Sequence, residues 1–425
     1  METAALIRGD AVAIPLRDES VDLIVTSPPY FALRSYTDGG EHYDGQIGSE
    51  ATPSAFLEAL WAVTAECWRV LKPSGSLFVN LGDKYAGSGG HNNGGIAKPD
   101  KKRKGWDAAN IPMGTTANAT RRTAPDRYNQ ASDGIRAKSL MGLPWRYAIG
   151  CIDGQADPDG RGWVLRSEIV WSKPNGLPES VTDRVRRSHE QWFHLTKEGR
   201  YYSNVDEVRE DAAPPSTTAL RGPTSGFKTN GDRGDLGMGN FMPNPLGKLP
   251  GSVWTVPTQP LIVPDWLDVD HFAAFPTEWP RRLILGWTPP GICVECGEGR
   301  RATSDKVRVD DGSRPTYVKS ANTAGHGHRY GHADTTTTIT GHACACDKPT
   351  APTTPAVVLD PFGGTGTVAL VARALGRYGV SCDLSGDYQR LARWRIFQSG
   401  QAARVAAKTD GERQLSMFQE VAAAP

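Results

Sequence analysis

Residues 21–30 read Val-Asp-Leu-Ile-Val-Thr-Ser-Pro-Pro-Tyr. The apolar run at 23–25 predicts a buried β-strand, because β-branched side chains favour strands. Pro28 and Pro29 lack an amide hydrogen and fix φ, so neither a strand nor a helix continues through them. The stretch predicts a rigid loop at the carboxyl end of a strand, where open α/β sheets bind ligands. A proline-rich turn without a function is the alternative.

Strands and helices alternate on both sides of this loop, in the β–α–β order of a parallel sheet. At helix 55–71, apolar residues recur at helical spacing, and Pro73, Ser74 and Gly75 are expected to end it. We expect the tail after 405 to be frayed. The other predicted helices are 143–151, 367–375 and 387–398, and the predicted strands are 5–7, 21–25, 76–80, 163–171, 190–196 (with an extension at 200–202), 357–359 and 379–382.

The composition restricts the class of protein. The 425 residues include 47 glycines and 31 prolines, so long loops are expected around the core. Seven cysteines, an odd number, argue against a disulfide framework. No run of 18 apolar residues or signal segment occurs, which predicts a cytoplasmic protein without a membrane segment. The net charge of +1 means that any nucleic-acid surface is local.

A second loop lies near the carboxyl end, where residues 360–367 read Asp-Pro-Phe-Gly-Gly-Thr-Gly-Thr between a predicted strand and helix. Glycines there allow a ligand to approach the backbone and the helix N-terminus. Asp383, at the end of the next strand, can accept both hydroxyls of a ribose. Residues 364–369 also fit the dinucleotide fingerprint, so an NAD enzyme is an alternative. Asp360 opposes it, because a carboxylate at the strand tip repels pyrophosphate.

Together, the two loops resemble those of the DNA amino-methyltransferases, which transfer a methyl group from S-adenosylmethionine to cytosine or adenine. The order, with Ser-Pro-Pro-Tyr before Asp-Pro-Phe-Gly-Gly-Thr-Gly, is that of their permuted type. The resemblance covers 5–82, 163–205 and 268–400, apart from a cysteine-bounded insertion. It implies an α/β fold with a Rossmann-like, mostly parallel, seven-stranded methyltransferase sheet and loop-rich insertions.

The resemblance also implies a cofactor site. Asp383 would bind the ribose of S-adenosylmethionine, and Asp10 matches an acidic position near the adenine. Residues 271–276 (His-Phe-Ala-Ala-Phe-Pro) resemble a segment that closes on the methionine part, although His271 alone would be a loop histidine. The residues implied in this site are Asp10, His271, Phe275, Pro276, Asp360, Phe362, Gly363, Gly364, Gly366 and Asp383.

The catalytic residues implied are Ser27, Pro28, Pro29 and Tyr30. An exocyclic amino group is a poor nucleophile until acceptors bind its hydrogens and localise its lone pair, a role that suits the Ser27 Oγ and the Pro28 carbonyl. The base must leave the duplex, and Tyr30 would stack on it unless it is a core residue. In this family a serine at position 27 favours N4 of cytosine over N6 of adenine.

Three further residues, Trp171, Lys173 and Asn175, resemble a segment that lines the far side of the base pocket. Trp171 could equally be a core residue. No cysteine nucleophile is expected, because this chemistry needs no covalent enzyme intermediate.

Cysteines bound the insertion at 293–350. Cys293 and Cys296 form a Cys-x-x-Cys half-site, and Cys344 and Cys346 a Cys-x-Cys half-site, which together predict a structural zinc. Reduced thiols without a metal are the alternative. Four histidines between the half-sites are possible replacement ligands: His326, His328, His332 and His342.

Residues 98–104 (Lys-Pro-Asp-Lys-Lys-Arg-Lys) predict either a disordered insertion or a loop that binds DNA phosphates. The expected partners are double-stranded DNA and a cognate restriction endonuclease, unless the enzyme is solitary; oligomeric state and recognition sequence stay open. The alternative of another class is a zinc-containing nucleic-acid-binding protein with a non-catalytic methyltransferase core. The expected divisions are a catalytic half (1–83), basic insertion (84–140), core continuation (141–205), loop-rich recognition segment (206–250), cofactor-pocket segment (251–292), zinc insertion (293–350), cofactor-binding half (351–405) and tail (406–425).

Overall fold

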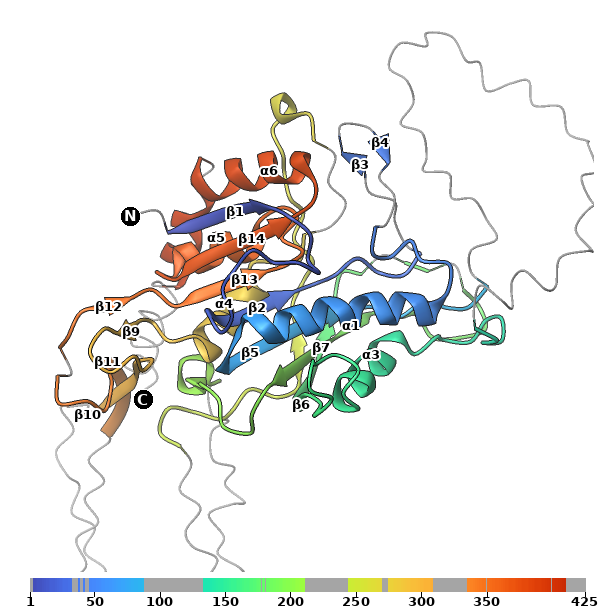
Figure 1. Ribbon diagram of the computed structural model, residues 1–425. Coiled ribbons are helices and arrows are strands. Elements are labelled where there is room, and N and C mark those ends of the chain that lie inside the picture. Colours follow the sequence, from blue (N-terminus) through green and yellow to red (C-terminus); the bar gives the residue numbers. More distant parts are fainter. Residues whose placement is uncertain are drawn as a thin grey trace, which may run out of the picture.

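A central eight-stranded sheet organises the chain (Figure 1). The computed structural model describes residues 3–32, 37–38, 41–42, 46–87, 133–176, 178–179, 181–210, 244–269, 274–308, 335–348, 350–398 and 400–409. β7 runs antiparallel to both neighbours, and every other pair of adjacent strands is parallel. The strand order is β1 (Ala4–Arg8), β14 (Tyr378–Asp383), β13 (Val357–Asp360), β2 (Val21–Thr26), β5 (Leu71–Leu81), β7 (His189–Thr196), β6 (Val164–Ser172) and β8 (Val253–Thr255).

The predicted mostly parallel α/β sheet is therefore confirmed, but its predicted number of seven strands is wrong. The additional strand is β8, which pairs with the edge of β6 between Val170 and Ser172. It escaped prediction because three residues are too few for a periodic pattern.

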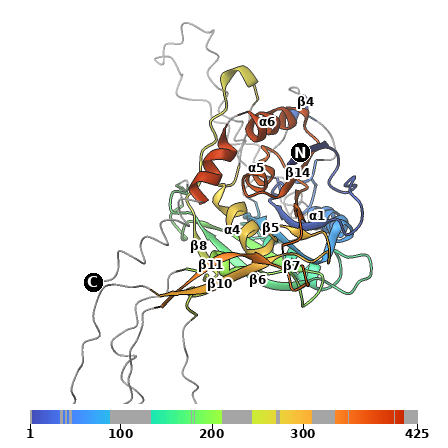
Figure 2. The same ribbon diagram turned by 90° about the vertical axis from the view of Figure 1, so that its left-hand side faces the viewer.

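Helices cover both faces of the sheet (Figures 1 and 2). α1 (Pro53–Val70) and α3 (Leu143–Ile152) pack on the face that receives Ile24, whereas α4 (Glu278–Trp287) and α5 (Thr367–Ala374) pack on the face that receives Leu23 and Val25. Successive strand residues point to opposite faces, so a strand buried on both sides is mostly apolar. The two polar residues of β2, Asp22 and Thr26, are buried and hydrogen-bonded. α6 (Gly386–Phe397) packs beside α5 near β1.

Tryptophans form the core beneath α4. The Trp279 ring stacks on Trp192 at 4.8 Å and on Trp254 at 5.0 Å, and Trp171 meets it edge-on. Trp171 is buried and its indole donates to the Val256 carbonyl, so it belongs to this core.

The remaining elements of the described residues lie outside the central sheet. They are two turns of 3-10 helix, η1 (Val205–Val208) and η2 (Asp265–Leu267), and three two-stranded ladders: β3 (Thr37–Asp38) with β4 (Glu41–His42), β9 (Ile292–Cys293) with β12 (Thr353–Thr354), and β10 (Arg301–Arg308) with β11 (Thr335–Ala343).

Most predicted helices and strands are present, with three corrections. The first helix ends at Val70 and not at 73–75, because Leu71 is already extended and pairs with Val21 in the sheet. Residues 200–202 form no strand, and the chain is helical over 401–409, beyond the predicted start of fraying. Much of the two predicted loop-rich segments, at 88–132 and 211–243, lies outside the described residues. Across the described parts of the chain, no helix combines the length and apolar character needed to span a membrane.

Candidate active site

The two loops singled out in the sequence lie side by side. β2 and β13 are parallel neighbours, so Thr26 and Asp360 end adjacent strands at the carboxyl edge of the sheet. The Thr26 hydroxyl donates a 2.8 Å hydrogen bond to Asp360 Oδ1 across 334 positions of sequence. Pro28 and Phe362, one from each loop, line the same small cavity. The loop predicted to be catalytic (26–30, here the catalytic loop) and the glycine loop (360–367) therefore lie together at one edge of the sheet.

The glycine loop folds over the tip of β14. The Gly364 amide donates to Asp383 Oδ2 at 2.8 Å, and Gly364 and Gly366 have φ of +46° and +74°. A Cβ on Gly363 would lie 1.9 Å from Ser381 Oγ, so only glycine fits there. A Cβ on Gly364 would meet only the Phe362 carbonyl at 3.8 Å, which leaves this part of the backbone open to a ligand.

Three carboxylates end neighbouring strands beside this loop. Asp10 follows β1, Asp383 ends β14 and Asp360 ends β13; the Gly9 amide donates to the Asp383 carbonyl at 3.2 Å. Asp360 is 1% exposed, and burial raises the pKa of its carboxyl to about 7, although hydrogen bonds from Thr26 and the Phe362 amide oppose the rise. Both of these bonds use Oδ1. Within the described residues, Oδ2 accepts no hydrogen bond.

A network of polar side chains holds the catalytic loop. Ser27 Oγ donates to Asn80 Oδ1 at 3.2 Å, and the Tyr30 hydroxyl lies 2.8 Å from the same atom and 2.9 Å from Glu190 Oε2. Asn80, 1% exposed, donates from Nδ2 to the Gln191 carbonyl, so its orientation is fixed. Because its oxygen receives the Ser27 hydrogen, the lone pairs of Ser27 Oγ remain available to accept another hydrogen bond.

The far end of this network carries a salt bridge. Lys173 Nζ pairs with Glu190 Oε1, and both side chains are less than one-fifth exposed. Lys173 also lies 4.1 Å from the centre of the Trp171 ring. The Glu190 carboxylate that faces Tyr30 is thereby held by the ammonium group of Lys173, the residue after β6.

Two glycines make room for the Tyr30 side chain and its backbone. A Cβ on Gly82 would lie 2.7 Å from Tyr30 Cε2, so the ring lies directly against the backbone that follows β5. Gly48, with φ of +96°, approaches the Tyr30 carbonyl and the ring of Pro29. Gly82 therefore packs against the aromatic ring, and Gly48 packs against the backbone on either side of it.

The remaining predicted residues have the following places. Phe275 packs edge-on against Trp192 in the core, and Pro276 begins the turn into α4. Trp171 had been interpreted either as lining the base pocket or as a core residue, and it is a core residue. Asn175 exchanges two hydrogen bonds with the Thr258 backbone. His271 lies outside the described residues.

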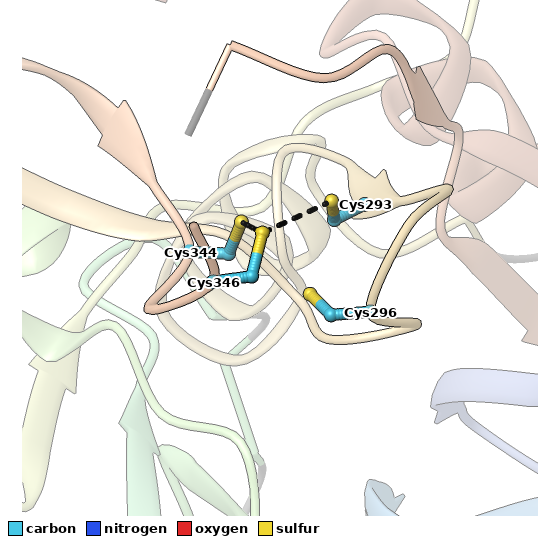
Figure 3. A group of neighbouring side chains, drawn as sticks. All are labelled: Cys293, Cys296, Cys344 and Cys346. Carbon is cyan, nitrogen blue, oxygen red and sulfur yellow. Dashed lines mark hydrogen bonds between the residues drawn. The ribbon is translucent and has the colours of Figure 1, made fainter. Parts of the chain in front are cut away.

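The four predicted metal ligands come together away from this site (Figure 3). The sulfur atoms of Cys293, Cys296, Cys344 and Cys346 all lie within 4.8 Å of one another. His342, a possible replacement ligand, is instead bonded to Glu207 at 2.6 Å. His326, His328 and His332 lie outside the described residues.

Sequence reasoning missed the supports of the catalytic loop, namely Thr26, Asn80, Gly82 and Glu190. A signal for them existed, because Asn80 and Glu190 are polar residues at the ends of predicted strands. The carboxyl ends of parallel strands share one edge of a sheet with the amino end of an antiparallel strand. That edge therefore brings together the end of β5 and the start of β7.

Comparison with known proteins agrees with this geometry. The sequence profile described as "DNA methylase" (N6_N4_Mtase) matches residues 21–294. The type II methyltransferase M.XycI of Xanthomonas campestris pv. cyanopsidis is 31% identical over 407 residues, which cover 95% of this chain and 91% of the relative. The chain belongs to the N6/N4 DNA methylases. It is an S-adenosylmethionine-dependent DNA methyltransferase of the cytosine-N4 or adenine-N6 type.

Two more proteins were found to be similar to the chain. The type II methyltransferase M.Cfr9I of Citrobacter freundii is 37% identical over 293 residues, covering 68% of this chain and 75% of the relative. Among solved structures, the cytosine-N4-specific PvuII DNA methyltransferase aligns with 96% of this chain and 93% of its own, at 13% identity and a TM-score of 0.49.

Proposed function

We propose that this methylase is a site-specific type II enzyme that methylates N4 of a cytosine turned out of the duplex. The observation that carries methyl transfer to an amino group is the hydrogen bond from Ser27 Oγ to Asn80 Oδ1, and the choice of cytosine rests on the serine at position 27. It orients the Ser27 hydroxyl as an acceptor at the mouth of the site. The second acceptor is the Pro28 carbonyl, because Pro28 lies beyond the end of β2 and takes no part in the pairing of the sheet.

These two acceptors suit an exocyclic amino group. When each amino hydrogen is bonded to oxygen, the nitrogen lone pair is localised and can attack a methyl group in line. When bound, S-adenosylmethionine would supply that methyl group from its sulfonium, with S-adenosylhomocysteine as the leaving group. One proton then leaves the nitrogen for solvent. Tyr30, held by Gly82 and Glu190, would stack on the extruded base.

The neighbouring loop fits the cofactor. Asp383 and Asp10 would bind the ribose and adenine ends, and the open backbone at Gly364 would receive the amino-acid end. Oδ2 of Asp360 would face a positive group of the cofactor. NAD, the alternative ligand for a glycine loop, would place its pyrophosphate near this carboxylate and be repelled.

Double-stranded DNA is the proposed substrate, and a cognate restriction endonuclease is the proposed partner, because the relatives are named type II methyltransferases. We assign recognition of the DNA to segments 84–140 and 206–250, which flank the core continuation (141–205) in sequence. Methylation of DNA by this enzyme would take place in the cytoplasm.

The test identifies the methylated nucleoside. Unmethylated duplex DNA is incubated with the protein and S-adenosylmethionine, digested, and separated by chromatography with mass spectrometry; modification-calling sequencing gives the site. N4-methylcytosine is expected. N6-methyladenine alone would overturn the choice of base. Tight cofactor binding with no methylated nucleoside on diverse genomic DNA would instead support a non-catalytic nucleic-acid-binding protein.

A further inference from the structure

The cysteine cluster lies at the edge of the sheet opposite to the active site. β12 carries the chain from the cluster into the start of β13, whereas the active site lies at the end of β13. Tyr202, which donates to the Arg300 carbonyl at 2.6 Å, has its own amide bonded to Ser74 near the start of β5. In Figure 1, β9 and β12 accordingly lie beyond the amino ends of the parallel strands.

The cluster joins all the strands of the insertion at one point. Cys293 belongs to β9, which pairs with β12, and Cys296 precedes β10. Cys344 and Cys346 follow β11, whose last residue, Ala343, pairs with Arg301 at the start of β10. The sulfur atoms therefore meet at the base of the β10–β11 hairpin, where the chain enters and leaves it.

The spacing of the sulfur atoms suits a metal and not a disulfide. Cys344 Sγ lies 3.2 Å and Cys293 Sγ 4.0 Å from Cys346 Sγ, and every cysteine of the chain is a free thiol. A disulfide needs about 2.05 Å between sulfurs. Four thiolates at about 2.3 Å from one zinc ion lie about 3.8 Å apart in a tetrahedron, which is within the observed spread.

The loops are shaped to present these thiols together. Gly297, with φ of +71°, closes a tight turn in which its amide donates to the Cys293 carbonyl at 2.9 Å. Lys348 bridges to Glu295 at 3.0 Å, so a salt bridge ties the second loop to the first. The two half-sites are thus held facing each other by contacts other than the sulfurs.

We infer that Cys293, Cys296, Cys344 and Cys346 bind one zinc ion in a closed, purely structural site that fastens the base of the insertion. Four protein thiolates fill a tetrahedral shell and leave no position for substrate or water, as in structural zinc sites. The ion is needed because two-stranded ladders are marginally stable alone. This inference does not depend on the methylation proposed above.

Hydrogen bonds between the β10–β11 hairpin and the segment 203–207 hold the insertion against the rest of the protein. His342 bonds to Glu207 of η1, the Ala302 amide donates to Asn204 Oδ1 at 3.3 Å, and Arg301 donates to the Ser203 carbonyl. The zinc would therefore stabilise the docking of the insertion on residues 202–207, remote from Ser27.

Metal analysis of the whole chain tests the inference. Protein purified without chelator should contain one zinc per chain, and replacement by cobalt should give the charge-transfer and visible bands of a tetrahedral thiolate site. Cys293→Ser and Cys346→Ser should lose the metal. The matched control is His342→Gln, which removes a potential ligand already bonded to Glu207 and should retain one zinc.

Stability and activity separate a structural role from a catalytic one. Apo protein and the two serine variants should melt at least about 5 °C lower, and proteases should cleave them within 297–343. S-adenosylmethionine affinity and single-turnover methyl transfer, measured below the melting transition, should change less than twofold. Metal-free protein with a Cys344–Cys346 disulfide, or a cobalt spectrum without thiolate bands, would overturn the site. A loss of transfer in a still-folded zinc-free protein would overturn its structural role.

Discussion

The two edges of the sheet are built in opposite ways. At the carboxyl edge, side chains far apart in sequence meet because the strands that carry them are hydrogen-bonded neighbours, as Thr26 and Asp360 show. At the opposite edge, the four cysteines come from an insertion that makes a few contacts with the core. A sheet can position catalytic groups without a metal, whereas a small insertion lacks the buried surface to do so. Substitutions at one edge should therefore change chemistry, and substitutions at the other should change stability.

The largest expected effect is that of Ser27→Ala. It removes one of two acceptors for the amino group, so the rate of methyl transfer should fall by about 10²–10³. Cofactor affinity, measured by calorimetry, should change less than twofold. Ser20→Ala is the matched control, because Ser20 precedes β2 at its opposite end and, among the described residues, its hydroxyl bonds only to the Arg17 carbonyl. Methyl transfer at the full rate by the Ser27→Ala variant would contradict the assignment of Ser27 as an acceptor.

Gly82→Ala should have the next largest effect. The added methyl group would lie 2.7 Å from Tyr30 Cε2, so the ring must move away from its position beside Asn80 and Glu190. We expect kcat/KM for DNA to fall by about tenfold, or about 1.4 kcal/mol, with the cofactor Kd unchanged. Gly199→Ala is the control, since a Cβ there meets nothing within 4 Å. Equal kcat/KM for both variants would show that the position of Tyr30 is unimportant.

A third prediction concerns pH. The Asp360 carboxyl has a pKa of about 7 in the folded protein, mainly because of burial, against 3.8 for the free group. Between these values the unfolded chain loses its proton first, so this group makes the apo protein less stable as pH rises from about 4 to 7, with no further loss above 7. A cationic cofactor favours the ionised carboxylate.

Cofactor affinity should therefore rise with pH and level off above 7. The limiting slope is about tenfold per pH unit at the acid end. Calorimetric titrations between pH 5.5 and 8.5 measure it, with protonation heats corrected in two buffers. Asp360→Asn should bind weakly at every pH and abolish the slope. A slope that persists in this variant would assign the titration to another group.

The two loops were predictable from sequence because the prolines of one and the glycines of the other restrict the backbone locally. Paired prolines after an apolar run, and closely spaced glycines after another, specify strand ends with little help from the rest of the chain. What joins the loops was not predictable, because the bond from Thr26 to Asp360 depends on the order of strands in the sheet. The composition around 293–346 likewise indicated ligands, but not their position at the far edge.

The end of α1 and the burial of Trp171 also depend on contacts that are distant in sequence. Leu71 continues the helical spacing of α1, yet pairing with Val21 draws it into β5, because sheet hydrogen bonds outweigh local propensity. Trp171 had two interpretations, and only its contact with Trp279 across the sheet face distinguishes them. Tertiary neighbours decide such residues, and a single sequence does not name those neighbours.

The smallest expected effect comes from Thr26→Val, which tests the joint between the loops. Valine keeps the shape of threonine but leaves Asp360 Oδ1 with the Phe362 amide as its one donor among the described residues. The hydrogen bond from Thr26 lowers the pKa of Asp360, so its loss should raise that pKa. The pH at the midpoint of the rise in cofactor affinity should therefore move to a higher value. The free energy of unfolding should fall by about 1 kcal/mol. Thr255→Val, at an exposed position of β8, controls for the loss of a strand hydroxyl. An unchanged midpoint with lowered stability would mean that the bond holds the two strands together without tuning the cofactor site.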